Sequence, residues 1–170
     1  MAGDKLIAFH MIGSHGPTYY QRYPAEHRHF RPECARSDIE NCTQEQLVNT
    51  YDNTIRHTDY VLAQMIEKLK QYSEQYNTVL LYVSDHGESL GESGLYLHGT
   101  PYKLAPDQQT HIPMQLWMSP GFIAAKNINA ACLQHNAVNR TYSHDNLFAS
   151  VLGLWDITTG AYLPESDLFR

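Results

Sequence analysis

The sequence predicts an α/β sandwich with a largely parallel sheet, and two observations carry that prediction. Short, unbroken apolar runs at residues 6–9, 78–83 and 114–118 are typical of strands buried on both faces. A long amphipathic pattern lies between the first two runs, and the order strand, helix, strand favours parallel neighbours. With 170 residues, 42% of them hydrophobic and 18% charged, the chain fits one globular domain.

The elements follow in order along the chain. The run at 6–9 leads into the Gly-Ser-His-Gly-Pro cluster at 13–17, which reads as a strand that enters a loop. Residues 18–41 are polar, rich in Tyr, Pro, His and Arg, and lack periodicity, so we expect a surface excursion. Thr43 and Gln46 form a capping box, and apolar residues at helical spacing then predict a helix that ends before residue 78.

A last helix is expected near the C-terminus, beyond the strand at 114–118. Ser143 can cap it, and Gly153 stands at its end. Its predicted core-facing residues are Leu147, Phe148, Val151 and Leu152.

Charge and hydropathy exclude some classes of partner. The net charge is -6 with only 12 Lys and Arg, which provides no basic surface for a phosphate backbone, so nucleic acid is a poor partner. No apolar run reaches the ~18 residues of a membrane span, and no signal peptide is present, so the chain as written is expected to be soluble. We interpret Met1 and Ala2 as residues added at a cut made before a core strand.

Two of the three cysteines bracket a polar loop. A disulfide between Cys34 and Cys42 is favoured over two unrelated thiols, because the loop has little apolar content and a free thiol there would be exposed. Closing so short a loop would contribute about 2 to 3 kcal/mol in an oxidising compartment. Cys132 stands in an Ala-rich stretch and is expected to be a small buried apolar residue.

The Asp85-His86 pair is the sharpest chemical signal, because it directly follows the strongest predicted strand. Ligands bind at the carboxyl ends of strands in open α/β sheets. A carboxylate oxygen and an imidazole nitrogen are both good zinc ligands, and Gly87 lets the backbone turn without a side chain that blocks the metal. The alternative is structural: Asp85 caps a following helix and His86 makes an ordinary hydrogen bond.

Two further histidines stand in glycine-flanked loops, His15 and His98. With His86 they would form a cationic or metal-binding pocket suited to a phosphate. Five other histidines are assigned surface or packing roles: His27, His29, His57, His111 and His135.

Four segments together resemble the lipid A phosphoethanolamine transferases, including the mobile colistin-resistance enzymes. They are IGSHGPTYY (12–20), LVNTYDNT (47–54), YVSDHGESLGE (82–92) and YLHG (96–99). The likeness runs from about Leu6 to Leu154. It implies an alkaline-phosphatase and sulfatase fold, and a parent enzyme whose membrane helices precede a periplasmic catalytic domain.

The resemblance also implies chemistry and roles. The parent would move phosphoethanolamine from phosphatidylethanolamine to lipid A at the periplasmic face of the inner membrane, an activity linked to polymyxin and colistin resistance. Asp85 and His86 match two ligands of the catalytic zinc. His15 and His98 match histidines that contact the transferred phosphate or a second zinc. Cys34 and Cys42 match a family disulfide.

The resemblance further implies that residues 1–170 are part of the catalytic domain. The family's nucleophilic threonine, a zinc-ligating glutamate and the membrane domain would lie upstream. We therefore expect weak zinc binding, an inactive fragment, and an apolar sheet edge that invites self-association. Two alternatives stay open: a sulfatase-like or phosphoglycerol-transferring enzyme, and a non-catalytic metal-binding module.

Overall fold

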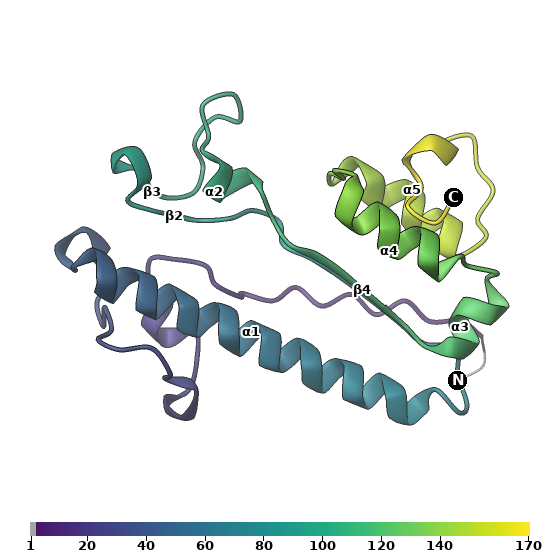
Figure 1. Cartoon of the computed structure of the whole chain (residues 1–170), viewed down its shortest axis with the longest axis horizontal. Helices are drawn as coiled ribbons and strands as arrows, with labels where there is room; N and C mark the ends of the chain where they lie inside the picture. Colours follow the sequence, from purple (N-terminus) through teal and green to yellow (C-terminus); the bar gives the residue numbers. More distant parts are fainter. Residues whose placement is uncertain (1–2) are drawn as a thin grey trace. The chain divides into compact units, whose positions relative to one another are not determined.

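A computed structural model describes residues 3–170, which form two compact units (Figure 1). The first unit contains the chain up to Lys68 together with Leu81–Gln115, and the second contains Leu69–Leu80 and Leu116–Arg170. The interpretation of Met1 and Ala2 as added residues lies outside the described part. Within that part, no helix combines the length and the apolar character that crossing a membrane requires.

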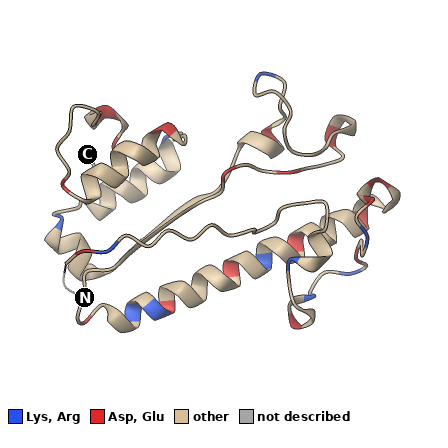
Figure 2. Ribbon diagram, turned by 180° about the vertical axis from the view of Figure 1, so that it is seen from behind, with Lys and Arg blue, Asp and Glu red and all other residues tan. Residues whose placement is uncertain are grey.

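The predicted long helix is confirmed as α1 (Gln44–Tyr72). Its capping box forms as expected: the Gln46 amide donates to Thr43 Oγ1 at 3.2 Å, and the Thr43 amide donates to Gln46 Oε1 at 2.9 Å. Leu47 and Leu62 are buried on its apolar side. Acidic and basic residues are interspersed along the helix, with no long stretch of one sign (Figure 2).

Two of the three predicted strands form, β1 (Val79–Val83) and β4 (Met114–Met118), and they pair with each other. The Ser84 amide donates to the Pro113 carbonyl at 3.2 Å, and the Ser119 amide donates to the Thr78 carbonyl at 2.9 Å. These two bonds join opposite ends of the strands, so the pair is antiparallel. A shorter pair, β2 (Ser89–Leu90) and β3 (Tyr96–Leu97), is also antiparallel.

The prediction of a largely parallel sheet is therefore wrong for the described residues. That prediction needed residues 6–9 as a first strand beside β1, and these residues are extended but form no strand. Leu6, Ile7 and Phe9 are 68%, 68% and 71% exposed, so the expected burial is wrong as well. A strand forms only where a neighbour accepts its backbone hydrogen bonds, and within residues 3–170 β1 is paired with β4 alone.

Residues 18–41, called the excursion here, are more than a surface loop. They contain three 3-10 turns, η1 (Tyr19–Gln21), η2 (Ala25–His27) and η3 (Ile39–Asn41). The core of the first unit combines excursion residues with residues from α1 and β2, namely Tyr19, Cys34, Ile39, Leu47 and Leu90. The predicted Cys34–Cys42 disulfide is confirmed, with the two Cα atoms 5.8 Å apart.

The second unit is mainly helical, with α3 (Pro120–Ala125), α4 (Ala130–Asn139) and α5 (Asp145–Leu154). The last helix was predicted, and Ser143 Oγ accepts the Asp145 amide at its start. Its buried residues are Ala149 and Ser150, whereas Phe148 is 60% exposed, contrary to prediction. Cys132 is exposed on α4, so the expectation that it would be buried is wrong.

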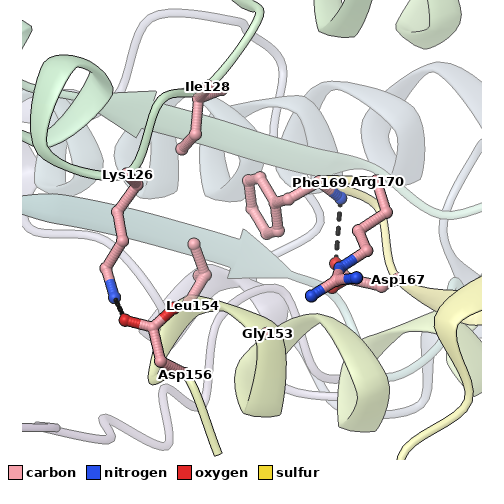
Figure 3. A pocket seen from close by; sticks show the side chains of 8 residues that line it. All are labelled: Lys126, Ile128, Gly153, Leu154, Asp156, Asp167, Phe169 and Arg170. Atoms are coloured by element: carbon pink, nitrogen blue, oxygen red, sulfur yellow. Dashed lines mark hydrogen bonds and ion pairs between the residues drawn. The ribbon is translucent and has the colours of Figure 1, made fainter.

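A small pocket lies within the second unit (Figure 3). It is lined by Lys126, Ile128, Gly153, Leu154, Asp156, Asp167, Phe169 and Arg170. An ion pair of 2.5 Å joins the Lys126 ammonium to Asp156 at its rim. None of the predicted site residues lines this pocket.

The remaining short elements lie in the connections. They are η4 (Glu92–Gly94), α2 (Asp107–Thr110) and η5 (Pro164–Ser166).

Candidate metal and phosphate site

Three histidines meet in the first unit, each from a different loop. His15 follows the extended N-terminal segment, His86 follows β1, and His98 follows β3. The ring centroids of His86 and His98 are 3.9 Å apart, and those of His15 and His98 are 4.9 Å apart. One possible ligand atom from each ring lies within 4.8 Å of the others, and the described residues contain no second group of this kind. The convergence predicted from the sequence is present; the roles assigned to these histidines stay predictions.

The Nδ1 atom of each of these three histidines has a partner. His15 Nδ1 lies 2.6 Å from the Gly16 carbonyl oxygen, and His86 Nδ1 lies 3.0 Å from that of Gly87. His98 Nδ1 lies 3.2 Å from Glu88 Oε1. Because carbonyl and carboxylate oxygens only accept, each Nδ1 must donate, which leaves Nε2 as the remaining nitrogen. Imidazoles that bind metals are oriented in this way, so the three rings fit a metal ion.

Asp85 lies at the rim of this cluster, with a side chain 76% exposed. Its Oδ2 atom is 3.8 Å from His86 Nε2, a separation at which both atoms can face one ion. Its Oδ1 atom accepts the His86 amide at 3.0 Å. The structural alternative for Asp85 was that it caps a helix, and the next regular element after it is the strand β2.

Glu88 is a central residue that sequence reasoning did not single out. Its side chain is 3% exposed, and its Oε1 atom accepts both the Gly16 amide at 3.0 Å and His98 Nδ1. Its Oε2 atom accepts the Tyr19 hydroxyl at 3.3 Å. Its place in the 82–92 segment was its one signal in the sequence. Its burial could not be predicted, because it depends on contacts with residues about 70 positions away.

The charge of Glu88 affects the pKa values of two nearby tyrosines, the buried Tyr19 and the partly buried Tyr51. Burial, followed by the charge of Glu88 and the hydrogen bond to it, raises the pKa of Tyr19 well above its usual range. Burial and the same charge raise the pKa of Tyr51 to about 12. Both phenols therefore stay protonated near neutral pH, so Tyr19 is a permanent donor to Glu88 there.

Two glycines allow close approaches behind the histidines. A Cβ atom on Gly87 would lie 2.0 Å from the Gln108 carbonyl oxygen, and one on Gly16 would lie 2.5 Å from a Leu97 methyl carbon and 2.6 Å from the Tyr19 hydroxyl. The close approach of the Gln108 backbone is therefore the observed requirement for glycine at position 87, whereas the sequence had suggested room for a metal.

A buried glutamine fixes the loop that carries His98. Gln109 is 6% exposed, its Nε2 atom donates to Ser89 Oγ at 2.8 Å, and its Oε1 atom accepts the Thr100 amide at 3.3 Å. Ser89 is fully buried. The Ser84 hydroxyl donates to the His86 carbonyl at 2.7 Å. Both serine hydroxyls are thus engaged in hydrogen bonds within the first unit.

Some of the other histidines have packing partners. His27 packs against His57 with centroids 4.7 Å apart and against Tyr60 at 4.5 Å. Burial, and then the neighbouring His27, lower the pKa of His57. His29 packs edge-on against Phe30.

The comparisons with known proteins agree over nearly the whole chain. The sulfatase family model matches residues 2–157. The phosphoethanolamine transferase EptA of Salmonella typhimurium is 48% identical over 170 residues, which is all of this chain and 31% of that protein. The phosphatidylethanolamine transferase Mcr-1 of Escherichia coli is 37% identical over 167 residues, 98% of this chain and 29% of that protein.

Solved structures show the same relationship. The soluble domain of lipooligosaccharide phosphoethanolamine transferase A from Neisseria meningitidis superimposes with a TM-score of 0.90 at 48% identity, over 93% of this chain and 47% of that one. The C-terminal periplasmic domain of EptC from Campylobacter jejuni gives 0.82 at 44% identity, over 93% and 49%.

The chain thus spans about a third of the length of its curated relatives and about half of the solved periplasmic domains. The fold of the matched part is sulfatase-like, as the resemblance implied. The chain belongs to the sulfatase family, and within it to the group of the EptA and Mcr phosphoethanolamine transferases.

Proposed function

We propose that this chain supplies half of the catalytic centre of a zinc-dependent enzyme that transfers phosphoethanolamine from phosphatidylethanolamine to lipid A. The observation that carries the proposal is the meeting of His15, His86 and His98, each with Nδ1 engaged and Nε2 left over. Relatives named as phosphoethanolamine transferases match the entire chain, which supports the choice of the transferred group.

Asp85 and His86 would hold the zinc ion. Their facing atoms, Oδ2 and Nε2, are a carboxylate oxygen and an imidazole nitrogen, both of which zinc accepts. When bound, zinc polarises phosphoryl oxygens and lowers the pKa of a hydroxyl nucleophile.

His15 and His98 would bind the phosphoryl group or a second zinc. A protonated imidazole donates from Nε2 to a phosphate oxygen, which neutralises charge and can supply a proton to the departing oxygen. A neutral imidazole offers the Nε2 lone pair to a metal instead. Glu88 keeps the His98 ring oriented for either role, because Nδ1 donates to its buried carboxylate.

The nucleophilic threonine, a glutamate ligand of zinc and the membrane domain are proposed to belong to the part of the parent protein that this chain does not include. The chain covers 31% of EptA, and one solved relative is described as an integral membrane protein, which supports this division and a site at the periplasmic face of the inner membrane. Alone, the 170 residues would be inactive and bind zinc weakly.

A chimera tests the proposal. The matching segment of Salmonella EptA is replaced by this chain, and transfer from phosphatidylethanolamine to lipid A is measured in membranes beside hydrolysis of a sulfate ester. We expect transfer, loss of transfer with His86→Ala, and full transfer with His135→Ala, a control on an exposed histidine of α4.

Two outcomes would oppose the proposal. Sulfate ester hydrolysis without transfer would favour a sulfatase-like enzyme. Tight 1:1 zinc binding by the isolated chain, lost with His86→Ala, would favour a non-catalytic metal-binding module, because the three histidines alone would then complete a site.

A further inference from the structure

Tyr19 is held rigidly beneath the histidine cluster. Its side chain is 1% exposed and packs in the core with Cys34, Ile39, Leu47 and Leu90. Its ring meets the Tyr51 ring edge-on, with centroids 5.5 Å apart. A phenol packed on all sides loses little further entropy when its hydroxyl makes a hydrogen bond, so the position of the hydroxyl is fixed by the core.

That hydroxyl holds one oxygen of the buried Glu88 carboxylate. Tyr19 donates to Oε2, while Gly16 N and His98 Nδ1 donate to Oε1. The carboxylate is 3% exposed, so water cannot readily replace a lost donor. Without a donor on Oε2, the carboxylate is held through Oε1 alone, so rotation about its last bond becomes easier and the hydrogen bond from His98 Nδ1 is less well aligned.

We propose that Tyr19 is a positioning residue for His98 that acts through Glu88. Its hydroxyl fixes the carboxylate so that His98 Nδ1 keeps one acceptor and the His98 ring keeps its position beside His15 and His86. Tyr19 itself touches no reacting atom. The excursion, tied to the core through the Cys34–Cys42 disulfide, thereby sets the orientation of a site residue.

The matched variants are Tyr19→Phe and Tyr51→Phe, which each remove one hydroxyl from the same aromatic pair. Nitrogen-15 NMR of the 170-residue chain follows the solvent exchange of the His98 Nδ1 proton, a readout that needs neither zinc nor activity. We expect Tyr19→Phe to speed this exchange about tenfold, as the loss of one hydrogen bond to a charged group implies, and Tyr51→Phe to leave it unchanged.

Zinc titration gives a second readout, which rests on the proposed function. Loss of an outer partner of a metal-bound histidine weakens binding by about 10- to 100-fold, and Tyr19→Phe, one step further out, should weaken zinc binding measurably but less than Glu88→Gln does. Additive effects of Tyr19→Phe and Glu88→Gln on His98 exchange would show that Tyr19 does not act through Glu88, and would overturn the inference.

Unchanged exchange of the His98 Nδ1 proton in folded Tyr19→Phe would also overturn the inference. The proposed transfer reaction would not be affected by that result, because the chimera tests it separately. Should phenylalanine at this position prevent folding, 3-fluorotyrosine placed there keeps the ring and makes the hydroxyl a stronger donor. Exchange should then be slower than in the unmodified chain, and unchanged or faster exchange would contradict the inference.

Discussion

At the scale of residues, the site depends on the groups that hydrogen-bond to its side chains as much as on the atoms that would contact a ligand. The three imidazoles are oriented through Nδ1 by two backbone carbonyls and by Glu88. Glu88 is in turn held by the Gly16 amide and the Tyr19 hydroxyl. Tyr19 therefore orients Glu88, and Glu88 orients His98. Removal of a buried hydrogen-bond partner should disturb the site even when that partner contacts no ligand.

Gly87→Ala should be destabilising, because the new methyl group would lie against the Gln108 backbone carbonyl and one of the two segments must move. Forced overpacking of this kind costs about 1 to 3 kcal/mol. The control is Gly160→Ala, where nothing lies within 4 Å of the new carbon. Urea unfolding of both variants measures the difference, and equal stabilities would contradict the observed close approach.

Sequence reasoning identified the residues whose surroundings are local. The capping box of Thr43 and Gln46 depends on atoms three residues apart, and β4 is bounded by Pro113 and Pro120, so both elements were predicted. Asp85 and His86 stand out because they directly follow β1. Glu88 could not be recognised, because its environment is built by Gly16 and Tyr19, far away along the chain.

At the scale of elements, the errors have the same origin. The order of elements predicted residues 6–9 as a parallel neighbour of β1, whereas β1 pairs antiparallel with β4, and which strands pair is a long-range property. Cys132 and Phe148 stand in apolar stretches, but their exposure depends on which helix face is covered. The excursion lacks periodicity, yet its disulfide and Tyr19 bring it into the core.

Reduction of the Cys34–Cys42 disulfide should weaken the first unit, because Cys34 is 2% exposed within its core and the bond closes a short loop. The free energy of unfolding should fall by about 2 to 3 kcal/mol. Denaturant unfolding with and without reductant checks this in a Cys132→Ser background, which removes the free thiol. An equal free energy of unfolding with and without reductant would show that the disulfide does not stabilise the unit.

At the scale of the whole molecule, an apolar segment remains uncovered. Leu6, Ile7, Phe9 and Ile12 are 63% to 71% exposed, and residues 6–9 are extended without a strand partner in the described structure. Extended apolar segments whose backbone groups are unpaired tend to pair with a strand edge of another chain. The solved domains that match this chain are about twice its matched length.

We therefore expect the isolated chain to self-associate as its concentration rises. Ile7→Lys should reduce the association, since it places a charge in the exposed segment, whereas Ile55→Lys, at a site 47% exposed on α1, serves as the control. Sedimentation velocity over a concentration series measures both variants. A monomeric wild-type chain at every concentration would contradict the expectation.

Zinc titration of the chain by calorimetry tests the central claim most directly, namely that His86 with its neighbours Asp85, His15 and His98 forms a metal and phosphate site. We predict weak binding of zinc that disappears with His86→Ala, weakens with Asp85→Ala and is unchanged with His135→Ala. Zinc binding that survives His86→Ala at full affinity would contradict the account.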